Sequence, residues 1–215
     1  MIIDDFYLNT AIIILIAYLI GSFPSAFIAG KITGVNILET GSRNVGGMNV
    51  MSSIGRPAGL LVITVDIIKG FSIAFLADRF SGGHPLIPLW AVIAVIIGHN
   101  WMFGIGFKGG KGVAAFIGGM LFLSPLSLLA LCLIIIPITL FIMMDIYLST
   151  ITGFFIFSFF LWFLKDSIWW LLFGLIVTLL CTIKCASLIK EYFISRRRDM
   201  SPVLKKIFRP SFRKG

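Results

Sequence analysis

The chain has 215 residues, of which 59% are hydrophobic and only 13% carry a charge. An ordinary soluble domain contains about 25% charged residues, because a water-soluble globule of this size needs polar side chains at most of its exposed positions. The composition therefore excludes a soluble fold and indicates that most of the chain lies in lipid.

The excess of 18 Lys and Arg over 9 Asp and Glu gives a net charge of +9. The basic residues lie in short loops and in a terminal tail, without the basic stripe and interleaved aromatic residues typical of nucleic-acid binding. Loops on the cytoplasmic face of a membrane carry the same excess of Lys and Arg. We therefore expect a lipid bilayer as a partner and no nucleic acid.

Six apolar runs contain few or no charges and are candidates for membrane spans, since a helix needs about 20 residues to cross a bilayer core. The runs cover residues 8–30, 58–77, 85–107, 113–144, 147–164 and 167–183. Asp4 and Asp5 precede the first run, where a secretory signal would have Lys or Arg. We therefore expect this run to be retained as a span.

The run from Val113 to Met144 is too long for one span, because its 32 residues would reach about 48 Å against a core of about 30 Å. Ser124-Pro125 is the natural break, since proline lacks a backbone donor and moves the preceding residue away from helical geometry. The sequence therefore predicts a short or partial helix at 113–123 and a full helix at about 126–143.

Counting crossings orients the chain, because each helix moves the next loop to the other side of the membrane. With two helices in the long run, the loop around Arg43, the loop with Lys108 and Lys111, and the basic C-terminal end all face the cytoplasm. The predicted fold is all-α: a polytopic helix bundle of the cytoplasmic membrane with seven transmembrane helices, the N-terminus outside and the C-terminus cytoplasmic. We expect one transmembrane domain over 1–189 and a basic cytoplasmic tail over 190–215.

The segment Gly104–Gly112 combines five glycines with two lysines and leads directly into the predicted short helix. Glycines let a backbone approach a ligand closely, lysines donate to anions, and a helix N-terminus attracts negative charge. The pattern is typical of a phosphate-binding loop, although it lacks the spacing of a Walker A motif. A flexible basic loop remains the alternative. The candidate phosphate-binding residues are Lys108, Gly109, Gly110, Lys111 and Gly112.

A second cluster, Gly41–Asn49, lies in the first predicted cytoplasmic loop. It combines glycines and small hydrogen-bonding side chains with one arginine, so it is suited to hold a phosphate or a polyol. A glycine-rich turn docked on the bundle is the alternative. The candidate binding residues are Ser42, Arg43, Asn44, Gly46 and Asn49, together with Ser22 as polar lining of the first span.

Four further residues place polar side chains inside apolar runs. Asp66 and Lys69 lie three residues apart, so they share a helix face and are expected to form a structural pair. His99 lies near the cytoplasmic end of its run, as a packing residue or a catalytic group. Ser149 lies at the start of the run that begins at residue 147, as polar lining or bonded to its own helix.

Several catalytic arrangements are missing from the sequence. There is no H-x4-D pair, no G-x-S-x-G elbow and no metal-binding cluster, and the three cysteines have neither disulfide nor zinc spacing. If the chain is an enzyme, we expect it to need no metal or cofactor. It would work by positioning its substrates and by electrostatic stabilisation of an anionic donor.

Four stretches together resemble the bacterial acyl-phosphate:glycerol-3-phosphate acyltransferase family, often called PlsY. Their order and spacing match over about residues 15–125, and a weaker likeness continues at Tyr147 to Ser149. The four stretches are Gly21–Pro24, Gly41–Val50, Asp66–Gly70 and Gly98–Ala114.

The resemblance implies seven transmembrane helices, an external N-terminus and a cytoplasmic active site. It implies transfer of a fatty acyl group from acyl phosphate to the 1-hydroxyl of glycerol 3-phosphate, which yields lysophosphatidic acid for phospholipid synthesis. The segment from Lys108 to Gly112 would then hold the phosphoryl group of the donor, and Ser42, Asn44 and Gly46 would build the substrate pocket. The predicted catalytic residues are His99, Lys111 and Ser149.

The chain departs from the family pattern mainly on the acceptor side. Met48 stands where the family usually has Thr, Ser52 where it has Arg, and Met102 where it has Pro. The family's C-terminal element is unrecognisable in Lys190–Gly215. Two alternatives therefore stay open: the same donor with a different acceptor, and a non-enzymatic anion-binding or transport protein of the same fold.

Overall fold

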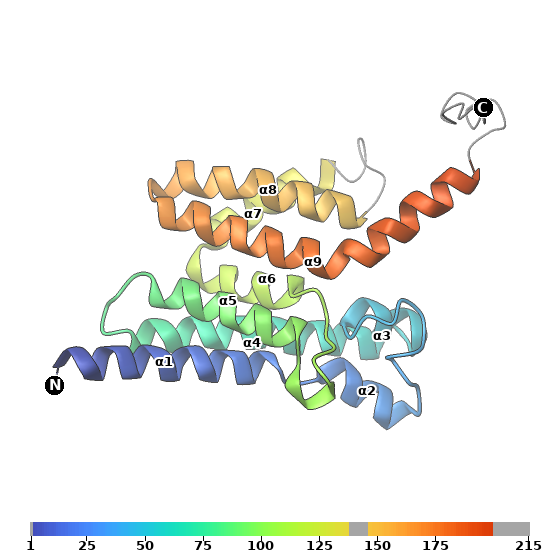
Figure 1. The fold of residues 1–215 in the computed structure, drawn as a ribbon, viewed down its shortest axis with the longest axis horizontal. Helices are drawn as coiled ribbons and strands as arrows, with labels where there is room; N and C mark the ends of the chain where they lie inside the picture. The colour runs from blue at the N-terminus through green and yellow to red at the C-terminus, as the bar shows by residue number, and fades with distance from the viewer. Residues whose placement is uncertain (1, 138–145, 200–215) are drawn as a thin grey trace, which may run out of the picture.

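The computed structural model describes residues 2–137 and 146–199 (Figure 1). Regular structure in this part of the chain is helical, apart from an isolated β-bridge between Met102 and Lys108. The α-helices are α1 (Ile2–Gly21), α2 (Ser25–Thr33), α3 (Gly47–Ser53), α4 (Arg56–Phe80), α5 (Ile87–Asn100), α6 (Val113–Leu123), α7 (Pro125–Pro137), α8 (Ile146–Lys165) and α9 (Ile168–Asp199), and a short 3₁₀ helix, η1, covers Phe103–Ile105.

Helix length and composition confirm the all-helical membrane architecture. Within the described residues, four helical segments are long and apolar enough to cross a bilayer, and three apolar helices are shorter. The long segments are Phe6–Thr33, Arg56–Phe80, Leu148–Lys165 and Ile168–Ala186, and the shorter ones are Ile87–Asn100, Val113–Leu123 and Pro125–Ile136. The helices follow the predicted apolar runs in order along the chain.

The long apolar run divides where the sequence predicts a break. α6 ends at Leu123 and α7 begins at Pro125, with Ser124 between them in a non-helical conformation (φ −165°, ψ 79°). The hydroxyl groups of Ser124 and Ser127 form a buried hydrogen bond of 2.7 Å, so the polar side chains at the break satisfy one another. α6 is therefore the short helix expected at 113–123.

The first apolar run is also interrupted, which the sequence analysis did not predict. α1 ends at Gly21 and α2 begins at Ser25, because Pro24 has no backbone N–H with which to continue the helical ladder. The Phe23 carbonyl at this break accepts a hydrogen bond of 2.6 Å from Lys69 Nζ in α4. A buried lysine thus supplies a donor to a backbone group that the broken helix leaves without its usual partner.

Glycines bring the helices into backbone contact at two junctions. A Cβ atom at Gly21 or at Gly98 would collide with a backbone carbonyl of the opposing helix, which places α1 directly against α5. Gly70 and Gly118 have the same effect between α4 and α6. Small residues at such contacts are typical of membrane bundles. In lipid there is little hydrophobic driving force between helices, so close packing holds them together.

The bundle has two groups of helices joined by aromatic side chains. Figure 1 shows α1, α4, α5 and α6 in one group and α7, α8 and α9 in the other. Phe116 of α6 is buried between the groups, with ring centroids 4.9 Å from Phe154 and 6.2 Å from Phe173. Packing at Phe116 therefore couples α6 to both α8 and α9.

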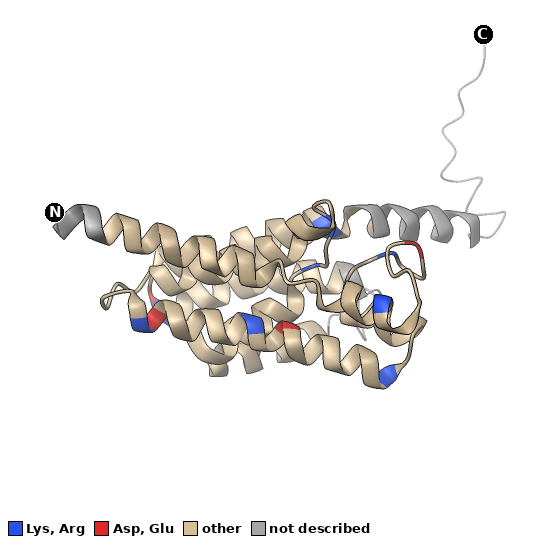
Figure 2. Cartoon of the chain, turned by 90° about the horizontal axis from the view of Figure 1, so that it is seen from below, with Lys and Arg blue, Asp and Glu red and all other residues tan. Residues whose placement is uncertain are grey.

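One end of the bundle gathers the segments that the sequence analysis assigned to the cytoplasm. α3, the connection between α5 and α6, and the extension of α9 all lie at the end opposite the N-terminus (Figure 1). Charged residues are sparse along the middle of the helices, apart from adjacent basic and acidic positions on α4 (Figure 2). α9 continues to Asp199, so the expected start of the tail at residue 190 falls within a helix, and residues 200–215 of the predicted tail lie outside the described part.

The acidic and basic positions on α4 are Asp66 and Lys69, which form a buried ion pair of 2.6 Å. Asp66 Oδ1 also accepts a hydrogen bond of 2.8 Å from Ser25 Oγ at the start of α2. Together with the bond from Lys69 to the Phe23 carbonyl, these contacts attach the break between α1 and α2 to the middle of α4. The pair is therefore part of the architecture of the bundle.

We expect Asp66→Leu to lower the unfolding free energy by about 3–5 kcal/mol, because it leaves the Lys69 ammonium buried without its counter-ion. Ser25→Ala, which removes one hydrogen bond, should cost only about 1 kcal/mol. The measurement is reversible unfolding of the purified protein in detergent micelles. Equal losses for the two variants would contradict a structural role for the ion pair.

Candidate functional site

The connection between α5 and α6 is a closed loop. Met102 N donates to Lys108 O at 3.1 Å and Phe107 N donates to Met102 O at 2.9 Å, so the loop doubles back on itself around η1. Gly106 and Phe107 adopt positive φ values of 70° and 57° at this turn. The loop therefore has a defined conformation, which favours the binding-loop interpretation over a flexible basic loop.

Gly109 and Gly110 pack this loop against the end of α5. Gly110 N donates a hydrogen bond of 3.0 Å to the His99 carbonyl. A Cβ atom at Gly109 would collide with the carbonyls of His99 and Asn100, and one at Gly110 would collide with His99 Nε2. Only glycine fits at these positions while the loop lies this close to the imidazole.

Gly110 is also the point where the two glycine-rich segments meet. The Cβ position at Gly110 lies 2.9 Å from the Val45 carbonyl, in the middle of the Gly41–Asn49 segment. Gly110 and Val45, which are more than fifty residues apart in the sequence, are thus neighbours, and the His99 ring of α5 lies next to Gly110. The structure thus brings together the Gly104–Gly112 and Gly41–Asn49 segments, which the sequence analysis proposed separately.

The loop ends in a helix N-terminus. Gly112 has a left-handed conformation (φ 78°) as the N-cap of α6, and its carbonyl accepts the first helical hydrogen bond, from Phe116 N at 2.8 Å. The N–H groups of the first helical turn have no partners within the helix, and the helix dipole adds partial positive charge at this point. Lys111, half-buried, stands directly before it, and Lys108 is exposed on the same loop. A helix N-terminus next to lysines is suited to an anion, so phosphate binding at this loop stays a prediction.

The Gly41–Asn49 segment is shaped by the side chain of Asn49. This residue is 2% exposed, and its Nδ2 donates to the carbonyls of Ile37, Thr40 and Asn44 at 3.3, 3.1 and 3.0 Å. Its Oδ1 accepts from Ser42 N at 3.0 Å. Asn49 therefore holds the loop in shape, a role that the sequence analysis did not give it, and its direct contact with substrate stays a prediction.

The other candidates in this segment lie on its outer side. Ser42 and Arg43 are exposed, Asn44 is half-buried and Gly46 is buried. Arg43 has a positive φ of 58°, which is unusual for a side chain of its size and is imposed by the tight turn. The Asn49 side chain thus bonds to the backbone of Ser42 and Asn44, whereas the side chains of Ser42 and Arg43 are exposed.

His99 lies between this site and the buried ion pair of α4. The residue is 3% exposed, its Nδ1 lies 3.7 Å from Asp66 Oδ1, and its Nε2 faces Gly110. Nδ1 has no hydrogen-bond partner among the residues that the structure describes. The Asp66 carboxylate thus lies behind the ring on the Nδ1 side, and Nε2 is the ring atom that faces the loop.

Two predicted residues lie farther into the helices. Ser22 is buried and donates to the Gly98 carbonyl at 3.3 Å, so it joins α1 to α5 beside His99. Ser149 is fully buried in α8, and its place next to the substrates stays a prediction. Among the described residues, no group of three His, Cys, Asp or Glu side chains is arranged to hold a metal ion.

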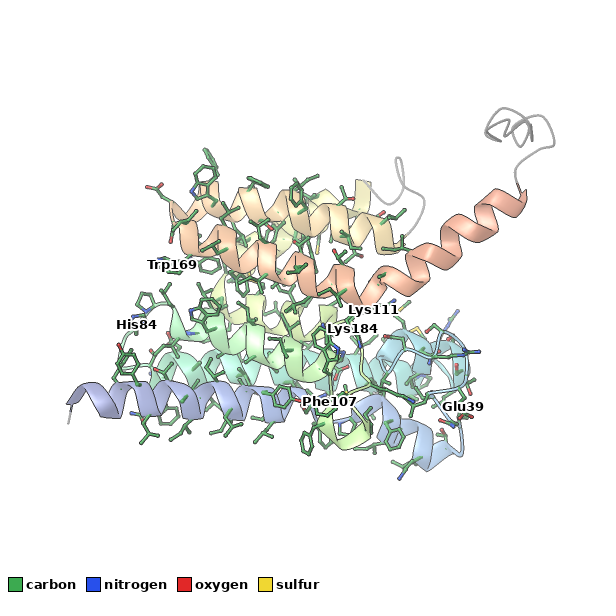
Figure 3. The ribbon with its side chains drawn as sticks, viewed as in Figure 1. Glu39, His84, Phe107, Lys111, Trp169 and Lys184 are labelled. Atoms are coloured by element: carbon green, nitrogen blue, oxygen red, sulfur yellow. The ribbon has the colours of Figure 1, made fainter. Side chains whose placement is uncertain are left out.

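Two residues at the site were missed by the sequence analysis. Asn100 is fully buried, and neither polar atom of its side chain has a hydrogen-bond partner in the described part of the chain. Lys184 of α9 donates a hydrogen bond of 2.7 Å to the Asn100 carbonyl. Figure 3 shows Lys184 and Lys111 at the junction of α9 with the loop. Lys184 could have been found in the sequence, because it directly follows the last apolar run. The predicted topology puts that end of the run on the same side of the membrane as the two glycine-rich loops.

The chain is similar to glycerol-3-phosphate acyltransferases over most of its length. A family model with the description "Glycerol-3-phosphate acyltransferase" matches residues 11–194. Among curated relatives, the glycerol-3-phosphate acyltransferase of Alkaliphilus metalliredigens is 45% identical over 120 residues, which cover 55% of this chain and 60% of that protein. The enzyme of Geobacillus kaustophilus is 42% identical over 134 residues, which cover 60% of this chain and 67% of that protein. The chain thus spans about three fifths of the length of the first of these relatives.

Solved structures show the same fold. The crystal structure of PlsY (YgiH), an integral membrane glycerol 3-phosphate acyltransferase, in its glycerol 3-phosphate form has a TM-score of 0.78 and 28% identity, and the match covers 93% of this chain and 99% of that one. Its lysophosphatidic acid form gives a TM-score of 0.76 and 29% identity, over 87% of this chain and 93% of that one. The resemblance seen in the sequence is confirmed: the chain belongs to the glycerol-3-phosphate acyltransferase family, and it shares the fold of an integral membrane member.

Proposed function

We propose that this protein transfers a fatty acyl group from acyl phosphate to glycerol 3-phosphate, releasing lysophosphatidic acid and phosphate. The observation that carries the proposal is the meeting of the two glycine-rich segments at Gly110, beside His99 and the N-terminus of α6. The similarity to structures that hold glycerol 3-phosphate and lysophosphatidic acid supports both the acceptor and the product.

Acyl phosphate is the donor that the site's chemistry favours. It is a mixed anhydride with a good leaving group, so the protein needs to align the acceptor hydroxyl and to stabilise the departing phosphate. Lys108, Lys111 and the first turn of α6 offer cationic and N–H donors to that phosphate. The hydroxyl attacks the acyl carbon, the bond to the phosphate oxygen breaks, and the hydroxyl proton passes to the phosphate of one of the substrates.

The remaining candidates receive roles from their positions. His99, 3% exposed and facing Gly110, would orient the reacting groups at the centre of the site, with Ser149 as a further catalytic candidate. Ser42, Arg43 and Asn44, on the outer side of the Asn49-shaped loop, would bind the acceptor. In this proposal the donor phosphate would bind on the α6 side of Gly110 and the acceptor on the α3 side.

We further propose a bundle of seven transmembrane helices in the cytoplasmic membrane, with α6 as a short or partial helix, the N-terminus outside and the site at the cytoplasmic face. The gathering of α3, the α5–α6 loop and the end of α9 at one end of the bundle supports this topology (Figure 1).

For the topology, a cysteine placed after Ser201 in a variant that lacks the three native cysteines should resist an impermeant thiol reagent in intact cells. His84→Cys is the matched control, because His84 is exposed at the opposite end of the bundle and should be labelled (Figure 3). Labelling after Ser201 and protection at His84 would reverse the proposed orientation.

The proposed reaction is tested with purified protein, palmitoyl phosphate and glycerol 3-phosphate, by following phosphate and lysophosphatidic acid. We expect both products to appear together, and Lys111→Ala to abolish turnover while the protein still inserts and folds. Phosphate release that does not depend on glycerol 3-phosphate would indicate another acceptor. A different acceptor is the second candidate function, because the exposed Met48 at the start of α3 replaces a residue usual in the family. Absence of acyl transfer by folded protein would favour the non-enzymatic alternative.

The close contact at Gly110 gives a sharper test of the site. We expect Gly110→Ala to lower kcat/KM by about 10²-fold, because an added methyl must displace the His99 ring or the loop, and small displacements of reacting groups have effects of this size. Gly104→Ala is the matched control in the same loop, since no atom lies within 4 Å of its Cβ position. Equal activity of the two variants would remove the contact from the mechanism.

A further inference from the structure

Side chains from two other helices bond to the C-terminal end of α5. Lys184 of α9 donates from Nζ to the Asn100 carbonyl at 2.7 Å, and its ammonium lies 5.3 Å from the centroid of the Trp101 ring. The hydroxyl of Tyr18 in α1 donates to the Trp101 carbonyl at 2.9 Å. The final carbonyls of an α-helix have no partners within the helix, and the negative end of its dipole attracts a cation. Lys184 and Tyr18 therefore satisfy the end of α5 from two different helices.

The two preceding carbonyls also accept hydrogen bonds from outside the helix. The Gly98 carbonyl accepts from Ser22 Oγ at 3.3 Å, and the His99 carbonyl accepts from Gly110 N at 3.0 Å. Four successive carbonyls at the end of α5 are thus bonded to α1, to α9 or to the following loop. A movement of this turn would break several of these bonds together, so they hold it in one place.

The His99 side chain extends from this turn into a tight space. A Cβ atom at Gly110 would collide with its Nε2, and its Nδ1 lies 3.7 Å from Asp66 Oδ1. The position of the ring relative to the loop therefore depends on where the end of α5 is held. A misplacement of a reacting group by about 1 Å costs about 10²-fold in rate, so small movements of this turn matter for a reaction at the loop.

Lys184 also connects this turn to the second group of helices. α9 lies with α7 and α8 in Figure 1, whereas α5 lies with α1, α4 and α6. Lys184 is half-buried where α9 meets the loop between α5 and α6 (Figure 3). Its bond to the Asn100 carbonyl is thus a direct polar contact between the second group and the turn that carries His99.

We propose that Tyr18 and Lys184 are positioning residues for acyl transfer, because their bonds to the Trp101 and Asn100 carbonyls hold the His99 ring against Gly110. Neither side chain has to touch a substrate in this role. The inference rests on the proposed function, since it concerns how the predicted catalytic histidine is held.

The kinetic test uses Tyr18→Phe and Lys184→Met, each of which removes a donor and keeps most of the volume of the side chain. We expect each variant to lower kcat about tenfold and to leave the KM of both substrates unchanged, because the His99 ring moves while the substrate contacts remain. Lys184→Arg, which keeps a charged donor, should retain most of the activity. Tyr18→Phe removes a single oxygen atom, so it gives a result even if Lys184→Met does not fold.

Tyr7→Phe and Lys165→Met are the matched controls. Tyr7 is exposed near the N-terminus, and Lys165 Nζ lies 5.1 Å from the centroid of the Trp170 ring, in a cation–π contact at the end of the bundle opposite the site (Figure 1). Neither control should change kcat or KM. A raised KM in Lys184→Met would mean that Lys184 binds substrate directly and would overturn the proposal, as would an unchanged kcat in both Tyr18→Phe and Lys184→Met.

A double-mutant cycle tests whether the two residues act through His99. In a His99→Ala background, Tyr18→Phe and Lys184→Met should have no further effect on the residual turnover, because the ring that they position is gone. Losses that simply add to that of His99→Ala would show that the two side chains act independently of the imidazole, against the proposal.

The histidine NMR signals give a readout that does not depend on activity. The chain has two histidines, and His84 is exposed at the opposite end of the bundle, so its signal is an internal reference. In protein with ¹³C-labelled histidine rings, Tyr18→Phe and Lys184→Met should shift the His99 signals and leave those of His84 in place. Unshifted His99 signals in both variants would contradict the inference even if activity falls. If the wild-type protein transfers no acyl group, the proposed function fails, and this comparison still decides whether the two bonds hold His99.

Discussion

The bundle depends on backbone contact at glycine positions. Gly21 and Gly98 hold α1 against α5, and Gly70 and Gly118 hold α4 against α6, each where a methyl group would strike a carbonyl. In lipid, helices gain little from burying apolar surface, so contacts of this kind decide which helices are neighbours. The first contact lies beside His99 and the second fixes the start of α6. The same constraint thus builds the fold and positions the two sides of the site.

The charged residues around the site form two groups, one within the helices and one in the connection between α5 and α6. Within α4, the charge of Lys69 is offset by Asp66, whose carboxylate also bonds to Ser25 and lies near His99. In the connection between α5 and α6, Lys108 and Lys111 stand beside a helix N-terminus that adds positive potential. The pair of Asp66 and Lys69 stabilises the protein without a ligand, whereas the lysines of the loop belong to the proposed phosphate site.

The sequence predicts much of this arrangement because lipid imposes simple rules. Long uncharged runs, the proline after Ser124 and the positions of the basic loops were enough to predict the helices in order and to place both glycine-rich segments at one membrane face. The Gly110 contact itself could not be predicted, since it depends on how α5 and α6 are rotated. That rotation follows from packing across the whole bundle.

Other features were missed for a related reason. The sequence analysis predicted one uninterrupted run through Pro24. In lipid, a helix break needs a partner for the backbone carbonyl that it leaves without one, and here that partner is Lys69 of another helix. The need for this distant partner cannot be seen in the sequence around Pro24. The hydrogen bonds of Asn49 reach backbone groups five to twelve residues away, and Lys184 acts across 84 residues. Local patterns do not encode such partners.

The shortness of α6 has a consequence for where the chemistry occurs. Its 11 residues extend about 16 Å, roughly half of the hydrocarbon thickness, so the two ends of this helix cannot both reach the interfacial headgroups. At its C-terminal end, the hydroxyl groups of Ser124 and Ser127 bond to each other, so these serines can lie within the hydrocarbon layer. If the proposed function holds, a fatty substrate with its polar head at the N-terminus of α6 would keep its methylene groups among the lipid acyl chains during the reaction, without extraction into water.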